Sequence, residues 1–184
     1  FLAMVNLQAG IIRGNTTSWD IVQASNLAQH VLQSIRIEAE QWTNTSTQDV
    51  NQAGFRYLQH VNDTVYADGS RGSGWLKAFD QGTVSFQLVN QIGRDTGYDQ
   101  GALTQIRATD NRKFCVRYRL TWLVTDYLIR AEVRVLWPRD LGNAGQYDAC
   151  PINIGSDSDM QQDVSNVYSV TYPTTVMRNV FVQP

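Results

Sequence analysis

Three aspartates lie close together in the segment GSDSDMQQD, at Asp157, Asp159 and Asp163. A hard cation such as Ca²⁺ takes several oxygen ligands from a flexible loop, so these carboxylates form a candidate calcium site. The segment lacks the terminal bidentate glutamate that completes an EF-hand loop. We therefore favour a solvated acidic loop and predict no metal.

Histidine and cysteine patterns do not indicate catalysis or zinc binding. The chain has two histidines, His30 and His60, and contains no GxSxG, HExxH or CxxC motif. A hydrolase needs a nucleophile, a base and oxyanion donors that come together, and the sequence supplies no such set. We expect His30 to pack against the rest of the protein from a helix, whereas His60, with Asp63 nearby, has no assigned role. The prediction is that the protein is not an enzyme and binds no cofactor.

Four arginines alternate with apolar residues in two neighbouring segments, with Glu132 among them: Arg117, Arg119, Arg130 and Arg134. If the segments pair as a hairpin, the arginines form a basic stripe on its polar face. One interpretation is an ordinary solvated sheet face, where alternating polar residues are expected. The other is a surface for a neighbouring subunit, because guanidinium groups pair well with carboxylates.

Cys115 and Cys150 are the two cysteines of the chain. An even pair predicts one disulfide in an oxidising compartment, and two independent buried thiols are the alternative. Closing this loop would stabilise the fold by roughly 3 to 4 kcal/mol. It would also tie the long loop 139–166 to the rest of the domain.

Composition favours one domain with a substantial core, together with a helix. The formal net charge is -2, 17% of residues are charged, and Lys and Arg form no run, so we expect no nucleic-acid partner. The opening apolar run FLAMVNLQAGII is shorter than the roughly 20 residues of a membrane span. No complete signal peptide or transmembrane span is therefore expected.

The longest predicted element is an amphipathic helix over residues 1–42, which would extend about 60 Å and project beyond the domain. Two glycines and a Thr/Asn cluster in 10–18 predict a locally soft stretch. We assign 1–18 to the projecting part and 19–42 to the domain core. The apolar stripe recurs at helical spacing, at Ile21, Ala24, Ala28, Val31, Ile35 and Trp42.

The clearest strand signal is the alternation in KFCVRYRLTWLVT (113–125) and YLIRAEVRVLW (127–137). A tight turn at Thr125-Asp126 would make them a hairpin with one apolar face and one face of Arg and Glu. Two closing strands, 167–173 and 176–183, are predicted around Pro173, at a sheet edge or a corner.

Residues 43–110 give mixed signals and form a variable region. Segment 55–61 is a short strand or a turn of helix, 61–74 is a loop, and 82–93 has the alternation of a strand. The expected fold is α+β, with the long helix covering the apolar face of an antiparallel sheet of about four strands. The sheet and the disulfide loop are expected within 111–184.

The helix combines an apolar beginning with the stretch SNLAQHVLQSIRIEAEQW (25–42), and the hairpin ends in LIRAEVRVLWP (128–138). In these features the chain resembles type IV minor pilins and pseudopilins, closest to the PilV type. The resemblance implies a pilin-like fold with a globular head over 19–184. It also implies that the apolar half-helix anchors the protein in the inner membrane and later packs in the filament core. The residues concerned would be Leu2, Val5, Leu7, Ile11 and Ile12.

The family's leader motif, cleavage glycine and early acidic residue are absent, and Val5 stands fifth. The processing and methylation site is therefore not carried over to Phe1, and the chain looks like a pilin that lacks most of its membrane half. Many pilins also close a C-terminal loop with a disulfide, at a different position from Cys115 and Cys150.

Two functions are expected from these features. The first is a structural minor pilin that helps to initiate or cap a type IV pilus, a filament of adhesion and motility. Its partners would be other minor pilins, the major pilin and a tip adhesin, and it would move from the bacterial inner membrane, with a periplasmic head, to the extracellular pilus. The alternative is an exported adhesin-like module whose region 49–101 binds a ligand.

Overall fold

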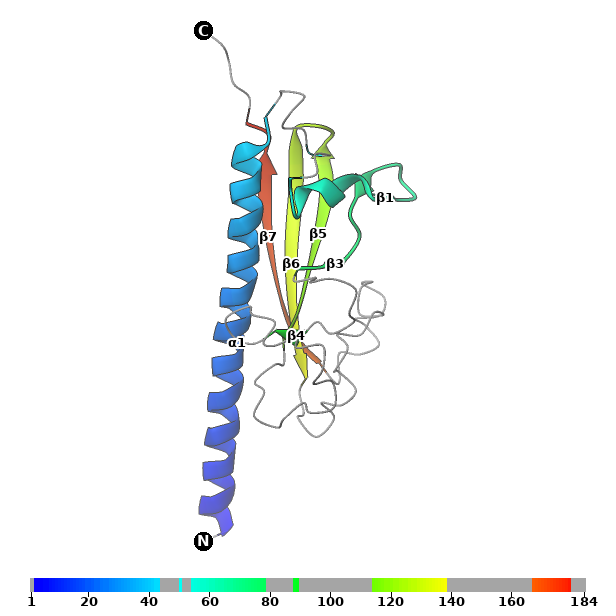
Figure 1. The fold of residues 1–184 in the computed structure, drawn as a ribbon. Helices are drawn as coiled ribbons and strands as arrows, with labels where there is room; N and C mark the ends of the chain where they lie inside the picture. Colours follow the sequence, from blue (N-terminus) through cyan, green and yellow to red (C-terminus); the bar gives the residue numbers. More distant parts are fainter. Residues whose placement is uncertain are drawn as a thin grey trace, which may run out of the picture.

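The computed structural model describes residues 2–43, 50, 54–78, 88–89, 114–138 and 167–179, and only the backbone of 2–17, 88–89 and 138. Its main elements are a long helix and three long strands: α1 (Leu2–Gln41), β5 (Phe114–Val124), β6 (Leu128–Pro138) and β7 (Val167–Met177). Five short elements complete it: η1 (Leu58–Asn62), β1 (Thr64–Val65), β2 (Arg71–Gly72), β3 (Leu76–Lys77) and β4 (Leu88–Val89). Figure 1 shows α1 lying beside the three long strands.

The predicted helix over 1–42 is confirmed, because α1 runs from Leu2 to Gln41 without a break through the glycine-containing stretch 10–18. In Figure 1 its N-terminal part extends beyond the end of β7. The C-terminal part packs on β6 and β7, where Tyr172 Oη donates a 2.9 Å hydrogen bond to Ser25 Oγ.

The buried stripe of α1 begins later than the sequence suggests. Ala24 is fully buried, whereas Trp19 is 64% exposed and Ile21 is 44% exposed. Our assignment of Ile21 to the core is therefore wrong: it has the helical phase of the stripe but precedes the part of α1 that is buried. His30, expected to pack inward, is also exposed. The buried side chains of the helical stripe are Ala24, Leu27, Ala28, Val31, Leu32, Ile35 and Ala39, followed by Trp42.

The predicted hairpin is confirmed: β5 and β6 are antiparallel partners, with Leu120 opposite Ala131 and Tyr118 opposite Val133. The turn between them places Asp126 at a φ of 60°, a left-handed conformation that Asp tolerates better than most residues. The N–H of Tyr127 donates to the carbonyl of Val124 across the turn.

The two closing strands predicted around Pro173 are in fact one strand, β7, which pairs with β6 along its whole length. Pro173 lies opposite Glu132. Since β7 is the last described strand on its side of the sheet, the missing N–H of Pro173 can face away from β6 without breaking the ladder. Of the two predicted settings for Pro173, a sheet edge or a corner, the described strands show the edge, and the predicted interruption is wrong because β7 is continuous. Residues 180–183 of the second predicted strand lie outside the described part of the chain.

The opposite edge of β5 is covered by three short strands instead of one long strand. β2, β3 and β4 pair antiparallel with β5 in turn, near Thr121, Tyr118 and Cys115, and β1 pairs with β2. The predicted loop 61–74 thus contains β1 and β2, and the ambiguous segment 55–61 becomes the 3₁₀ turn η1. Within the described residues the sheet has seven strands, more than the four or so expected, and the α+β arrangement is confirmed.

The core lies between the sheet and a layer formed by α1 and the segment around η1. Glu38 of α1 joins these two parts, because its carboxylate accepts hydrogen bonds from the backbone N–H groups of Arg56, Tyr57 and Leu58. Tyr57 then packs edge-to-face on Tyr118 of β5, with ring centroids 5.0 Å apart. One helix carboxylate thereby holds the chain that covers β5.

Candidate functional site

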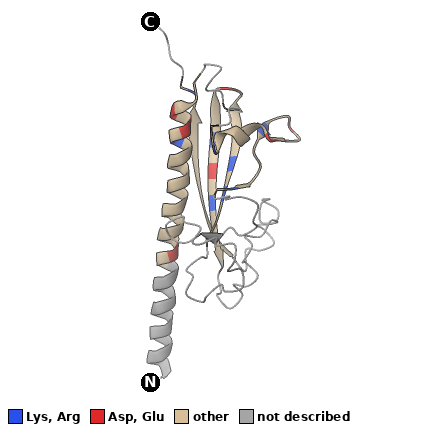
Figure 2. Cartoon of the chain, in the orientation of Figure 1, with Lys and Arg blue, Asp and Glu red and all other residues tan. Residues whose placement is uncertain are grey.

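The four predicted arginines lie on one face of the sheet, the face opposite α1. The β5–β6 register places Arg117 opposite Arg134, Arg119 opposite Glu132, and Thr121 opposite Arg130. Figure 2 marks basic and acidic positions close together on the central strands. The grouping expected from the alternation is therefore present in the structure.

Two of these arginines are not on an open surface. Arg117 is 4% exposed and Arg134 is 9% exposed. Trp75, between β2 and β3, lies over this face and stacks on two guanidinium groups, 4.1 Å from Arg134 and 4.6 Å from Arg119. Burial lowers the pKa of Arg117, since desolvation disfavours its charged form. An ordinary solvated sheet face is thus wrong at Arg117 and Arg134, and any partner would meet Arg119 and Arg130.

Glu132 is the central charge of this face and is 7% exposed. Its Oε2 accepts a 2.9 Å hydrogen bond from Arg119 Nε and lies 2.7 Å from Arg119 Nη2. Its Oε1 accepts a 2.8 Å bond from Arg130 Nη2. A buried carboxylate needs this kind of pairing, because desolvation would otherwise make its charge costly. Glu132 therefore fixes both guanidinium groups on the sheet.

A hollow of about 500 Å³ lies above this cluster, beside the turn between β1 and β2. The sheet contributes its floor and the turn contributes its rim. We call it the arginine hollow and define it by Arg119, Arg130 and Glu132 on the floor and Tyr66, Asp68 and Ser70 on the rim.

The rim is held by specific contacts. Tyr66 Oη accepts the N–H of Gly74, and a Cβ on Gly72 would meet both the Tyr66 ring and the backbone carbonyl of Leu120. Glycine at 72 therefore allows Tyr66 to lie against the strand. The hydroxyl and the backbone N–H of Ser70 both donate to Asp68 Oδ1. These hydrogen bonds lower the pKa of that exposed carboxyl, and the bond from the hydroxyl has the larger effect.

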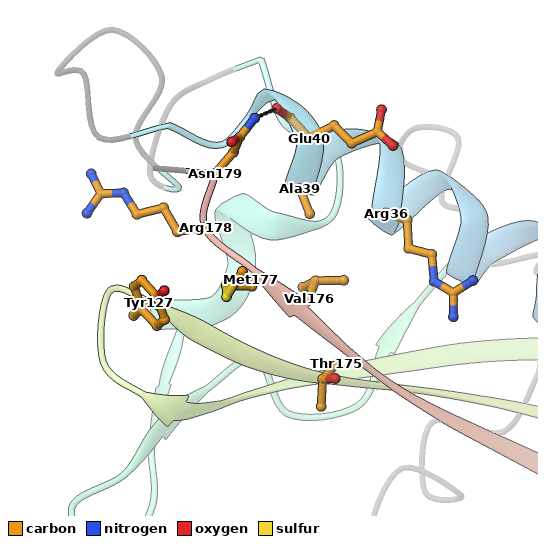
Figure 3. Close-up of a pocket in the computed structure, with 9 residues that line it drawn as sticks. All are labelled: Arg36, Ala39, Glu40, Tyr127, Thr175, Val176, Met177, Arg178 and Asn179. Carbon is orange, nitrogen blue, oxygen red and sulfur yellow. Dashed lines mark hydrogen bonds between the residues drawn. The ribbon is translucent and has the colours of Figure 1, made fainter. Parts of the chain in front are cut away.

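A second hollow, of about 560 Å³, lies where α1 meets the end of β7 (Figure 3). Its two arginines, Arg36 and Arg178, point away from each other in this view. Arg36 donates to Thr174 Oγ1, and Arg178 donates to the carbonyls of Thr43 and Asp126. Asn179 Nδ2 donates to the carbonyl of Glu40. These groups join the ends of the elements and do not converge on a common point.

The remaining predicted sites are partly within the described chain. Cys115 is 5% exposed in β5, whereas Cys150 lies outside the described residues, so the predicted disulfide between them stays a prediction. Of Leu2, Val5, Leu7, Ile11 and Ile12 the structure describes the backbone, as part of α1. Asp157, Asp159 and Asp163 also lie outside the described residues.

The described part of the chain holds one close contact between a histidine and an aspartate of the sequence 58–63. His60 Nδ1 lies 2.7 Å from Asp63 Oδ2, an exposed local pair. Within the described ranges no three His, Cys, Asp or Glu side chains are grouped to hold a metal ion. Among the same residues, no helix is both long enough and apolar enough to span a membrane.

Sequence reasoning missed the residues that cover and rim the polar face, Trp75, Tyr66 and Asp68. They belong to a region without regular periodicity, so no pattern placed them beside β5. The one available signal was the glycine-rich turn sequence YADGSRGSG (66–74), which indicates tight turns but not their position.

Comparison with known proteins identifies no relative. No family model, no curated protein and no solved structure matches this chain.

Proposed function

We propose that the protein is a structural minor pilin that takes part in type IV pilus assembly, in an initiation or tip complex. The observation that carries the proposal is the exposed apolar surface of α1 before its packing on the sheet begins. Trp19 is 64% exposed and Val22 is 51% exposed, on a helix that is continuous from Leu2. Neither side chain is needed to close the core, so both are available to a partner.

In this proposal, assembly proceeds by helix packing. Burial of apolar side chains between neighbouring helices favours association but does not select an orientation or a partner. Polar contacts between the heads select the partner. The partners are other minor pilins, the major pilin and a tip adhesin. The protein is held in the bacterial inner membrane with its head in the periplasm before assembly, and lies in the extracellular pilus afterwards.

The proposal is tested by mixing the protein with candidate minor pilins at tens of micromolar and measuring complex mass by light scattering. We expect a heteromeric complex that Trp19→Asp weakens by about 10-fold or more, because a charge would then be buried between helices. A protein that stays monomeric with every candidate would contradict the assembly role.

Thr125→Asp provides the matched control. It introduces the same charge at an exposed position in the β5–β6 turn, away from the exposed N-terminal part of α1. Both variants should unfold at the temperature of the original protein, since both positions are exposed. Equal weakening by the two substitutions would overturn the role of α1 and indicate a general charge effect.

A further inference from the structure

We propose that the arginine hollow binds a small carboxylate that also carries hydroxyl or ammonium groups, a class that includes uronic acids and amino acids. The site does not depend on the pilin proposal, because it is formed by β5, β6 and the β1–β2 turn and not by the exposed part of α1. Its volume of about 500 Å³ lies in the range of small-molecule sites.

The floor favours one negative charge. Arg119 and Arg130 stand beside a single buried carboxylate, Glu132, so the three charged side chains of the floor together carry one net positive charge. A monoanionic carboxylate matches this charge. A phosphate dianion would be repelled by Glu132, which lies between the two guanidinium groups.

Arg130 is the group best placed to meet the ligand. Its side chain is 49% exposed, and within the described chain its guanidinium makes one ion pair, through Nη2 to Glu132. Guanidinium groups present several N–H donors in a planar fork that suits a carboxylate. The bond to Glu132 holds the guanidinium of Arg130 at the hollow, which this side chain lines.

The neighbouring Arg119 makes the site rigid before a ligand arrives. Its guanidinium is bound to Glu132 and stacked 4.6 Å above the centre of the Trp75 ring. A side chain already fixed in this way loses little conformational entropy on binding. This distinguishes the arginine hollow from the hollow of Figure 3, whose two arginines point apart.

The rim residues determine which group the ligand carries at the end away from its carboxylate. Asp68 lines the hollow from the β1–β2 turn, and one of its oxygens accepts hydrogen bonds from Ser70. A carboxylate at this position favours a hydroxyl or an ammonium group and disfavours a second anion. The combination of a cationic floor and an anionic rim gives the proposed chemical class.

The test is isothermal titration calorimetry of the whole chain with glucuronate and with L-serine. Glucose and inorganic phosphate are the comparison compounds, because one lacks the carboxylate and the other carries more charge. We expect saturable binding, one ligand per chain, of at least one of the two carboxylates. Glucose and phosphate should bind about 10-fold more weakly or not at all.

Arg130→Gln should weaken binding by about 10-fold or more, whereas Arg36→Gln, at an exposed arginine outside the hollow, should leave it unchanged. Asp68→Asn should also weaken binding of the same ligand, but by a smaller factor. The unfolding temperature of each variant shows whether the chain still folds. Absence of saturable binding by both carboxylates, tighter binding of phosphate, or equal affinities of Arg130→Gln and the original chain would overturn the proposal.

Discussion

The two faces of the β5–β6–β7 sheet come from the same alternating segments, yet they are held together in different ways. The face toward α1 is apolar, and Leu120, Ile129 and Val133 on it are fully buried. The centre of the opposite face is also buried, but the buried side chains there are charged, namely those of Arg117, Glu132 and Arg134. Apolar burial needs only matching volume, whereas a buried charge needs a partner at the correct distance.

This difference predicts different sensitivities to substitution. On the apolar face the cost of a change depends on the volume removed. On the polar face it depends on whether a charged group loses its partner, even when the side chain keeps its shape.

The largest expected effect is on the apolar face. Ile35 of α1 is fully buried, so Ile35→Ala should lower the free energy of unfolding by about 3 kcal/mol, through lost burial and a residual cavity. Ile37→Ala, two residues further along the same helix at a side chain 57% exposed, should change it by less than about 0.5 kcal/mol. Urea unfolding measures both, and equal costs would mean that α1 does not pack on the sheet through this stripe.

An intermediate effect is expected on the polar face. Glu132→Gln keeps the shape of the side chain but removes the carboxylate that binds Arg119 and Arg130, and it should cost about 2 kcal/mol. The value is kept low because Arg130 is half exposed and its charge can be solvated. Chemical unfolding gives the difference.

The control for this change is Glu40→Gln, at an exposed glutamate near the end of α1. It should leave the free energy of unfolding within about 0.5 kcal/mol of the original value. If Glu132→Gln is as harmless as Glu40→Gln, the buried charge cluster does not stabilise the polar face, and the contrast between the two faces fails.

The smallest effect appears only at alkaline pH and concerns Tyr118, whose side chain belongs to the apolar face. Burial raises the pKa of Tyr118, and burial likewise raises that of its neighbour Tyr57. The unfolded chain therefore loses these protons first, at about pH 10, and the free energy of unfolding falls as the pH rises further. Below that pH the contribution is fully present.

Tyr118→Phe removes one of the two titrating groups. Its stability should therefore fall less steeply between about pH 9 and about pH 11, by up to about 1 kcal/mol over that interval. Urea unfolding at the two pH values measures the slope, with Tyr127→Phe, at an exposed tyrosine, as the comparison. Identical slopes for Tyr118→Phe and the original chain would show that Tyr118 is not buried as described.

Local patterns predicted the elements whose residues repeat with a clear period. The helix over 1–42 and the hairpin 113–137 were found because a single face of each is apolar, and burial of that face requires the observed conformation. Pro173 shows where local reasoning fails. The proline predicts a break between two strands, but where its missing N–H points away from β6 the strand continues without a lost hydrogen bond, and that orientation depends on how β7 pairs in the sheet.

The candidate site divides in the same way. Alternation alone determined that Arg117, Arg119, Arg130 and Arg134 share a face, because side chains in paired strands alternate between two faces. Only the tertiary structure decided which arginines are buried and that Glu132 is their central partner. The tertiary structure also places Trp75 over Arg119 and Arg134, although Trp75 is far from β5 and β6 in the sequence. Burial depends on what covers a face, and a repeating pattern carries no information about a covering segment that has no period of its own.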